Sequence, residues 1–282
     1  MKDYIGKLIL ITGGSSGIGL ALAEGLFKAG ASVFILARDQ KRLDDALTLI
    51  GSHRVDDTQQ LGTISVDVTD YDLLSEKLTA FMRTTGVPDI VFNSAGVARP
   101  GYVEMLDPEI FRWTMNINFH GTVNVNQVLL PELITRGSGH IINFSSLAGV
   151  LGVFGYTAYS GSKFAVRGYS DALRAELKPK GIRVSVVFPP DTDTPQLAWE
   201  DQYKPFETRV IAGSDKPMSA SKVAHVVLED VKKGKYNIVP GTEAKVLYFL
   251  ATRLGGAIYP IMDMLVKDAI RKKNSQNGSS SK

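Results

Sequence analysis

The sequence predicts an α/β fold: a single doubly wound parallel-sheet domain with a helical C-terminal extension. Short apolar runs alternate with segments of helical periodicity from residue 8 to residue 239, which is typical of strands joined by helical crossovers. A glycine-rich turn follows the first run, and a long apolar stretch occupies residues 246–266. We therefore expect one domain over residues 1–242, an amphipathic helical extension over 243–273 and a disordered polar tail over 274–282.

The composition is that of an ordinary globular protein. Hydrophobic residues make up 44% of the 282 residues and charged residues 22%, enough to bury a sizeable core. The chain has no cysteine, which excludes disulfides and thiolate catalysis and fits a reducing compartment. A net charge of +3 gives no argument for nucleic-acid binding. The first apolar run is too short for a signal peptide, so we expect a cytoplasmic protein.

The glycine-rich turn lies inside the first predicted βαβ unit. We expect a strand over residues 8–11, a helix that follows the turn TGGSSGIG (12–19) and stops at Gly30, and a strand over 32–37. Glycines in such a turn let backbone N–H groups approach a pyrophosphate at a helix N-terminus. The spacing is G-x-x-x-G-x-G, not the commoner G-x-G-x-x-G. A tight turn without a ligand is the alternative, but the register of strand, glycines and helix favours a dinucleotide site.

The end of the second predicted strand indicates which dinucleotide binds. A carboxylate there would hydrogen-bond the ribose 2′-hydroxyl of NAD, whereas an arginine suits the 2′-phosphate of NADP. The chain has Arg38 at this place and Arg42 one helical turn later. Asp39 lies one place beyond the usual acidic position, and we expect it to cap a helix. The pattern favours NADP(H); the alternative is that both arginines are solvated surface charges.

The alternation continues through the rest of the domain. Asp107 followed by Pro108 predicts the start of a long helix that ends near residue 135. We expect strands near residues 63–66, 89–92, 139–144, 183–188 and 237–239, and helices over 71–84, around Tyr159 and over 219–233. Residues 191–217 break the pattern and contain Trp199, Tyr203 and Phe206. A loop of this length often acts as a lid; a surface helix with packing aromatics is the alternative.

Two residues in a helical segment indicate proton-transfer chemistry. Tyr159 and Lys163 are four apart, so their side chains project from the same helix face. An ammonium group held there favours the phenolate, so we expect Lys163 to lower the pKa of Tyr159 from about 10. Such a phenol can donate or accept a proton in carbonyl reduction or alcohol oxidation. Upstream, a predicted strand ends at Ser145 and Ser146, where a hydroxyl can hydrogen-bond a substrate oxygen.

These motifs together resemble those of the short-chain dehydrogenase/reductase family over roughly residues 6–241. They are TGGSSGIG, NSAG at 93–96, the asparagine of NINFHG, and Ser146 with YSGSK at 159–163; NSAG departs from the commoner NNAG at its second position. The resemblance implies a Rossmann-type fold. PPDTDTP at 189–195 and GVFGYTAYSGSKFAVRGY at 152–169 are similar to one branch, the 3-ketodihydrosphingosine reductases, which reduce a long-chain keto-amino-alcohol with NADPH.

The resemblance also implies roles for individual residues. Tyr159 is the expected proton donor, Lys163 lowers its pKa and binds the nicotinamide ribose, and Ser146 orients the carbonyl, with Ser145 as the alternative serine. Asn118 is expected to hold a water molecule in a proton relay. The residues expected to line NADPH are Gly13, Ser15, Ser16, Gly17, Ile18, Arg38, Arg42, Asp67, Val68, Asn93, Tyr159, Lys163 and Thr192. No metal is implied, and a homodimer or homotetramer is expected.

Three functions remain open at this point. The first is NADPH-dependent reduction of a long-chain lipid ketone, as in sphingolipid biosynthesis. The second is a hydroxysteroid or other bulky-alcohol dehydrogenase on the same scaffold. The third is a non-catalytic sensor that binds NADP(H). The complete set of asparagine, serine, tyrosine and lysine argues against the sensor, which has no need of a proton-donating tyrosine.

The apolar stretch at residues 246–266 approaches the length of a membrane span, about 20 residues. Arg253 and Asp263 argue against spanning, because a central charge costs at least about 2.5 kcal/mol. Gly255, Gly256 and Pro260 predict a split into two helices. One narrow polar face is expected from Arg253, Gly256, Pro260, Asp263, Lys267 and Arg271, and an apolar face from Leu250, Leu254, Ile258, Ile261 and Leu265. Residues 246–271 would then lie in a membrane interface at the cytoplasmic face, or pack against the chain's own core or another subunit.

Overall fold

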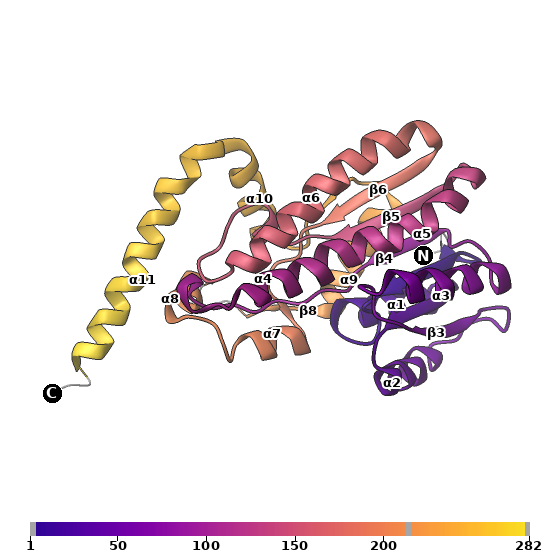
Figure 1. Ribbon diagram of the computed structural model, residues 1–282, viewed down its shortest axis with the longest axis horizontal. Coiled ribbons are helices and arrows are strands. Elements are labelled where there is room, and N and C mark those ends of the chain that lie inside the picture. The colour runs from indigo at the N-terminus through magenta and orange to yellow at the C-terminus, as the bar shows by residue number, and fades with distance from the viewer. Residues whose placement is uncertain (1–3, 213–215, 280–282) are drawn as a thin grey trace.

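Figure 1 shows the computed structural model, in which helices cover both faces of a parallel sheet. The structure describes residues 4–212 and 216–279, so the parts of the predicted insert and tail at 213–215 and 280–282 lie outside the described residues. Within this part of the chain, seven parallel strands pair in the order β3-β2-β1-β4-β5-β6-β9. The order reverses between β1 and β4, and ligands of such sheets bind at the carboxyl ends of the strands beside that reversal. The predicted doubly wound sheet is confirmed.

The bounds of the elements follow the apolar runs and the helix signals of the sequence. The sheet consists of β1 (Leu8–Thr12), β2 (Ser32–Ala37), β3 (Leu61–Ser65), β4 (Ile90–Asn93), β5 (Gly139–Phe144), β6 (Ile182–Val187) and β9 (Asn237–Ile238). The main helices that flank it are α1 (Gly17–Lys28), α2 (Gln40–Gly51), α3 (Tyr71–Thr84), α4 (Pro108–Met115), α5 (Gly121–Arg136), α6 (Thr157–Leu177) and α9 (Ala220–Lys232).

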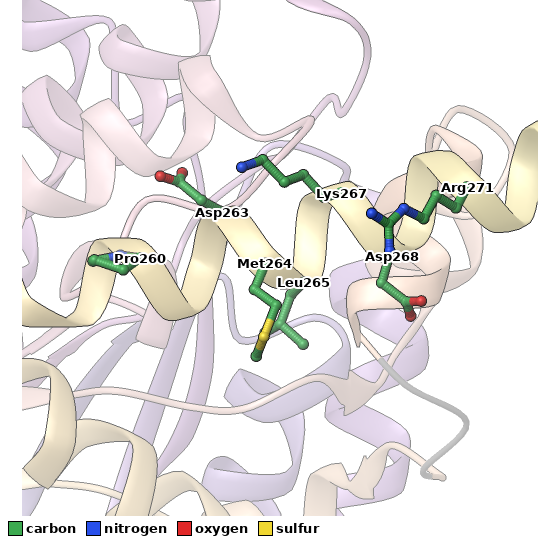
Figure 2. A pocket seen from close by; sticks show the side chains of 7 residues that line it. All are labelled: Pro260, Asp263, Met264, Leu265, Lys267, Asp268 and Arg271. Carbon is green, nitrogen blue, oxygen red and sulfur yellow. The ribbon is translucent and has the colours of Figure 1, made fainter.

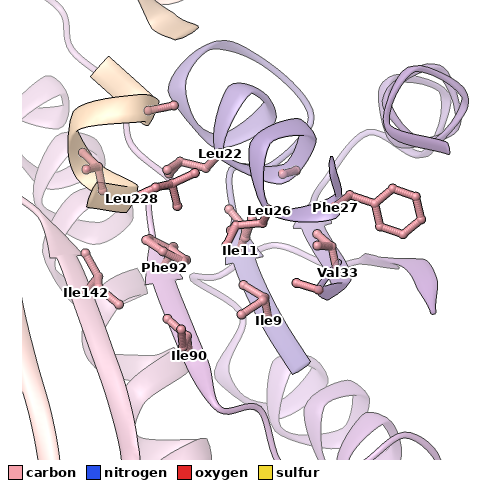
Figure 3. Close-up of a cluster of buried hydrophobic side chains, with 14 of the residues drawn as sticks. Ile9, Ile11, Leu22, Leu26, Phe27, Val33, Ile90, Phe92, Ile142 and Leu228 are labelled. Atoms are coloured by element: carbon pink, nitrogen blue, oxygen red, sulfur yellow. The ribbon is translucent and has the colours of Figure 1, made fainter. Parts of the chain in front are cut away.

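Two layers of buried apolar side chains hold these helices against the sheet. In Figure 3, Leu22 and Leu26 of α1 and Leu228 of α9 lie over Ile11 and Phe92, and all five belong to one buried cluster. On the opposite face, Leu10 and Val91 pack with side chains of α3, α5 and α6. Successive side chains of a strand point to opposite faces, so strands buried on both faces require near-continuous apolar runs. These apolar runs are the pattern from which the strands were predicted.

The helix predicted from Asp107 contains one π-helical turn. Asp107 caps α4 through its side chain, which accepts a hydrogen bond from the backbone N–H of Glu109 at 2.8 Å. The turn η3 (Asn116–His120) then joins α4 to α5. Such π turns are frequent at functional sites, and this one carries Asn118 in its middle.

The predicted insert is more ordered than a loop. It contains the short helices α7 (Pro195–Glu200) and α8 (Phe206–Ala212). At its two ends, β7 (Thr192–Asp193) pairs with β8 (Met218–Ser219). The insert therefore leaves and re-enters the domain at one place, which suits an element that covers a site.

The C-terminal extension forms two helices with a bend between them, as predicted from its glycines. α10 (Thr242–Leu254) ends at Gly255, whose positive φ of 52° favours glycine. The short turn η6 (Gly255–Ile258) leads into α11 (Tyr259–Ser279). The disordered tail expected from residue 274 is corrected for 274–279, because α11 continues through Ser279. No proline follows Pro260, and the Ser275 hydroxyl donates to the carbonyl of Arg271 at 3.0 Å within the helix.

Only a narrow side of α11 meets the rest of the protein. Ala269 is buried, and Lys273 forms an ion pair with Glu207 of α8 at 2.9 Å. In Figure 2, Asp263 and Lys267 project from one side of α11, and Met264 and Leu265 from the other. All the residues that line the pocket drawn there belong to α11, so it lies along the side of one helix and not between two elements. Among the described residues, the helical stretch Thr242–Gln276 is the one with the length and composition of a membrane span.

Candidate active site

The turn between β1 and α1 forms a cradle that only glycine permits. Gly13 has a φ of 67°, and a Cβ atom there would lie 2.8 Å from the Cα of Ala95. At Gly19 a Cβ atom would lie 2.3 Å from the carbonyl oxygen of Gly13. The extended Ser16 precedes α1 without a side-chain capping bond, which leaves the N–H groups of the first helical turn open to an anion. This geometry fits the pyrophosphate of a dinucleotide.

The insert approaches this cradle from the other side. A Cβ atom at Gly17 would lie 3.0 Å from Cγ2 of Thr194, the N-cap of α7. Two residues earlier, Thr192 is buried, and its hydroxyl donates to the carbonyl of Pro190 at 2.8 Å. Ser15 and Ile18 are half-buried beside the turn. The structure thus brings the turn of Ser15 to Ile18 against Thr194, two residues after the predicted Thr192.

Two arginines lie in solvent at the end of β2. Arg38 contacts Asp67 at 3.5 Å, and Arg42 contacts Asp39 at 3.7 Å. The Arg42 backbone N–H also donates to Asp39 at 3.1 Å, so the prediction that Asp39 caps α2 is confirmed. Both guanidinium groups are mostly exposed. Such exposed guanidinium groups can exchange these contacts for bidentate bonds with a phosphate, a geometry that suits arginine.

Two residues expected at the cofactor lie differently. The side-chain amide of Asn93 donates to Asn126 at 2.8 Å and to Asn143 at 2.9 Å, deep between β4, β5 and α5. Val68 is buried and packs so closely on α5 that a Cβ atom at Gly121 would lie 2.5 Å from its Cγ2. The buried amide of Asn93 joins two strands and a helix, so only the backbone of this residue is placed to line a cofactor. Val68 faces α5 with its side chain.

Tyr159, Ser146 and Lys163 come together at the carboxyl end of β5. Tyr159 and Lys163 lie in the first turns of α6, four residues apart as predicted, and the Tyr159 hydroxyl is hydrogen-bonded to that of Ser146. The Lys163 ammonium is buried and donates to the carbonyl of Phe144 at 3.0 Å. Ser145 points away, because its hydroxyl donates to the carbonyl of Lys163 at 2.8 Å. Of the two serines, Ser146 therefore lies at the tyrosine.

Asn118 lies next to the lysine. Its amide donates to the carbonyl of Val97 and to the Ser162 hydroxyl, both at 2.9 Å, and its oxygen accepts from the N–H of Val97 at 2.7 Å. A Cβ atom at Gly96 would lie 3.2 Å from the Asn118 oxygen and 3.3 Å from the Lys163 ammonium. Both groups thus converge on Gly96, the last residue of the NSAG motif. This position has to stay small for them to do so.

The charge balance at Tyr159 differs from the prediction. Burial raises the pKa of Tyr159 above its ordinary value, and the negative charges of Glu200 and Asp191 raise it further, while the hydrogen bond from Ser146 lowers it. Burial lowers the pKa of Lys163 to about 8. The prediction that Lys163 lowers the pKa of Tyr159 below its ordinary value is therefore wrong for the protein without bound ligands. A phenol in this state is a proton donor and not a base.

Glu200 is a site residue that the sequence analysis missed. It ends α7 and is only 6% exposed, and it accepts a hydrogen bond from the Tyr156 hydroxyl at 2.7 Å. The ring of Tyr156 lies 5.7 Å from that of Tyr159, so the insert reaches the proton donor through this pair. Gln196 and Glu200 are four residues apart, so they lie on one face of α7. This polar face on a short helix of the insert is the sequence pattern that could have indicated Glu200.

Aromatic side chains of the insert close over the same region. Trp199 lies 6.4 Å from Trp113 of α4 and 5.0 Å from Tyr203, measured between ring centroids. The guanidinium of Arg99 stacks on the Tyr203 ring at 3.3 Å from its centroid. Phe206 is half-buried at the start of α8. The insert therefore combines both alternatives drawn from the sequence, since it has short helices with packed aromatics beside the site.

These features match a known family. The family model described as short chain dehydrogenase covers residues 7–203, and the chain belongs to this family. It is 38% identical to the 3-ketodihydrosphingosine reductase of Bos taurus over 243 residues; the aligned region covers 86% of this chain and 73% of that protein. The 3-ketodihydrosphingosine reductase of Dictyostelium discoideum is 35% identical over 280 residues, or 94% of this chain and 84% of that protein.

Solved structures show the same fold. Levodione reductase superposes with a TM-score of 0.76 and 24% identity, covering 85% of this chain and 98% of that one. A short chain dehydrogenase from Burkholderia cenocepacia in complex with NADP gives a TM-score of 0.73 at 23% identity, covering 91% and 98%. The chain is accordingly an oxidoreductase of the short chain dehydrogenase family, and its glycine cradle and exposed arginines fit NADP(H).

Proposed function

We propose that the protein catalyses the NADPH-dependent reduction of a long-chain lipid ketone, 3-ketodihydrosphingosine, to dihydrosphingosine. The observation that carries this proposal is the position of the Tyr159 hydroxyl, which is hydrogen-bonded to Ser146 and lies beside the buried Lys163 ammonium. This is a proton donor held next to a second hydroxyl that can bind the same oxygen. The name of the substrate comes from the relatives in Bos taurus and Dictyostelium discoideum. The aromatic insert is consistent with a bulky apolar substrate.

The residues of the site perform the proton half of the reaction. NADPH, when bound, supplies the hydride, so the protein provides orientation and the acid. Ser146 and Tyr159 hydrogen-bond the ketone oxygen, and Tyr159 gives its proton to that oxygen as the alcohol forms. Lys163, with its buried ammonium, stabilises the phenolate left behind and would hold the nicotinamide ribose. Asn118 contributes a water-binding position to the relay that returns the proton.

The remaining residues of the site hold the cofactor. Gly13, Ser15, Ser16, Gly17 and Ile18 would hold the pyrophosphate at the start of α1, with Thr192 from the insert. Arg38 and Arg42 would bind the 2′-phosphate. Asp67 and Val68, which follow β3, would contribute their backbone, and the buried amide network of Asn93 holds β4 against β5 and α5.

A substrate panel tests the proposed function against its alternatives. NADPH consumption is measured with 3-ketodihydrosphingosine, with short-chain ketones of the same headgroup and with a set of 3-keto and 17-keto steroids. We expect the highest kcat/KM for the long-chain lipid ketone. A preference for steroids would identify a hydroxysteroid dehydrogenase. Tight NADPH binding without turnover of any ketone would identify a sensor.

We also propose that residues 246–271 contact a membrane interface. Half of the large hydrophobic residues that are exposed in the described part of the chain lie in this stretch, among them Phe249 and Met264, at 59% and 62% exposed. Packing on the chain's own core accounts for Ile258, which is 5% exposed. A bilayer interface would cover the apolar side, and Lys267 and Arg271 would lie near anionic headgroups. The lipid substrate would then reach the site from the bilayer.

The membrane prediction is tested with two exposed substitutions that leave the core intact. Phe249→Glu combined with Met264→Glu should reduce cosedimentation with phosphatidylcholine–phosphatidylserine vesicles about tenfold or more. The reason is that two apolar side chains that the bilayer would cover are replaced by charged ones. Leu49→Glu with Val55→Glu, at equally exposed apolar positions of the domain, serves as the control. Vesicle binding unchanged by the first pair would contradict the prediction. If that pair instead dissociates a dimer or tetramer in light scattering, the surface is a subunit contact.

A further inference from the structure

A buried carboxylate lies beside the proton donor with neutral hydrogen-bond donors as its partners. Glu200 accepts from the Tyr156 hydroxyl and from the Gln196 amide, both at 2.7 Å. Among the residues that the structure describes, Glu200 forms no ion pair. Lys204 follows it by one helical turn but pairs with Asp201 at 2.7 Å. An anion that is only 6% exposed and has no paired cation is costly to keep.

The position of this carboxylate is unfavourable for the reaction unless a cation joins it. Glu200 lies against Tyr156, whose ring is 5.7 Å from the Tyr159 ring. Its negative charge opposes the phenolate that Tyr159 becomes after giving up its proton, and Asp191 acts in the same direction. A purely structural anchor for α7 would need only a neutral acceptor for the Tyr156 hydroxyl. A carboxylate buried at this place, with neutral donors as its hydrogen-bond partners, suits a cation that arrives with the ligand.

We propose that Glu200 binds the ammonium group of an amino-ketone substrate and so selects 2-amino ketones over neutral ketones. The proposal rests on the proposed function, in which the substrate is a keto-amino-alcohol. In such a molecule the carbon that carries the ammonium is bonded directly to the carbonyl carbon. A carbonyl oxygen held by Tyr159 and Ser146 therefore brings the ammonium to the side chains that surround Tyr159, and Glu200 is the buried anion among them.

Two consequences follow from this pairing. The ammonium neutralises Glu200 while Tyr159 transfers its proton, so the phenolate forms beside an ion pair instead of a lone anion. Because Glu200 belongs to α7, the same contact connects the arrival of the correct headgroup with the seating of the insert over the site. Selection by Glu200 thus acts at the headgroup.

The decisive variant is Glu200→Gln, which keeps the shape of the side chain and an acceptor for Tyr156. The measurement is kcat/KM for 3-ketodihydrosphingosine divided by kcat/KM for its analogue with hydrogen in place of the amino group. We expect this ratio to fall about thirtyfold or more, the usual effect of removing one partner of a buried charge pair. Glu207→Gln, which alters an equally buried carboxylate on α8 that pairs with Lys273, should leave the ratio unchanged.

The pH profile separates charge recognition from a structural role. The titratable and polar groups near Glu200 are Tyr156 at the N-cap of α6, Tyr159 and Lys163 on α6, and Asp191, Gln196 and Lys204. Burial raises the pKa of Glu200. Its carboxylate is therefore lost as the pH falls through a value above that of an ordinary glutamate. In the wild type, KM for the amino ketone should rise over this range while KM for the neutral analogue stays level. Glu200→Gln should abolish the difference.

The outcomes distinguish this proposal from the proposed function. Equal losses for both ketones in Glu200→Gln would overturn the proposal and leave Glu200 as an anchor of α7. If the wild type reduces neither ketone, the proposed function fails, and binding of the amine dihydrosphingosine relative to its N-acetyl derivative decides the role of Glu200. A preference for the amine that disappears in Glu200→Gln supports ammonium recognition. An unchanged preference contradicts it.

Discussion

Tyr159→Phe should lower kcat for 3-ketodihydrosphingosine about 10²–10⁴-fold, the usual contribution of a general acid. The substitution removes one hydroxyl, and the ring remains to pack at 5.7 Å from Tyr156. Because the cofactor cradle is formed by other residues, NADPH binding should remain within about threefold of wild type. The measurements are steady-state turnover and the fluorescence titration of NADPH.

A second tyrosine of α6 provides the control for this experiment. Tyr169 lies further along the same helix, and its hydroxyl accepts a hydrogen bond from Asn126 at 3.3 Å, away from Ser146. Tyr169→Phe should keep kcat within about threefold. If Tyr159→Phe retains more than half of the wild-type rate, Tyr159 is not the proton donor.

Arg38→Asp combined with Arg42→Ala should move the cofactor preference from NADPH towards NADH by about a hundredfold or more. The double change removes two cations that lie in solvent at the end of β2 and adds an anion in their place. Repulsion then replaces attraction at the 2′-phosphate, while the pyrophosphate cradle is untouched. The ratio of kcat/KM values for the two cofactors measures the shift.

The neighbouring lysine shows whether the effect is local. Lys41 is exposed in the first turn of α2, between the two arginines in sequence. Lys41→Ala should leave the preference within about threefold of wild type, since screening weakens the effect of an exposed charge that makes no direct contact. A wild-type enzyme that already binds NADH more tightly than NADPH would refute the role of the arginines.

The sheet was largely predictable because both of its faces are buried. The strand 32–37, the helix 71–84 and the strand 139–144 were predicted with the bounds that the structure gives. β3 begins at Leu61, two residues before the prediction, because this edge strand is only half-buried and its first residues carry a weak apolar signal. The helices of the insert were open alternatives, since six or seven residues are too few for a clear period.

The site was predictable where spacing along one element determines it. The Tyr159–Lys163 pair depends on helical periodicity alone, and Ser146 on the end of a strand. The Asn93 network joins residues 33 and 50 positions apart, and Glu200 meets Tyr156 across 44 positions. Pairings over such distances leave no local pattern. The direction of the Tyr159 pKa was mispredicted for the same reason, because burial and the remote Glu200 outweigh the neighbour on the helix.

The most direct test of the central claim follows a single deuterium atom. NADPH carrying deuterium at both C4 positions of the nicotinamide is incubated with enzyme and 3-ketodihydrosphingosine in ordinary water, and the product is analysed by mass spectrometry. The proposed function predicts dihydrosphingosine with one deuterium on C3, and the hydroxyl hydrogen taken from exchangeable solvent protons through Tyr159. A product without deuterium at C3, or no conversion under conditions where the enzyme reduces another class of ketone, would contradict it.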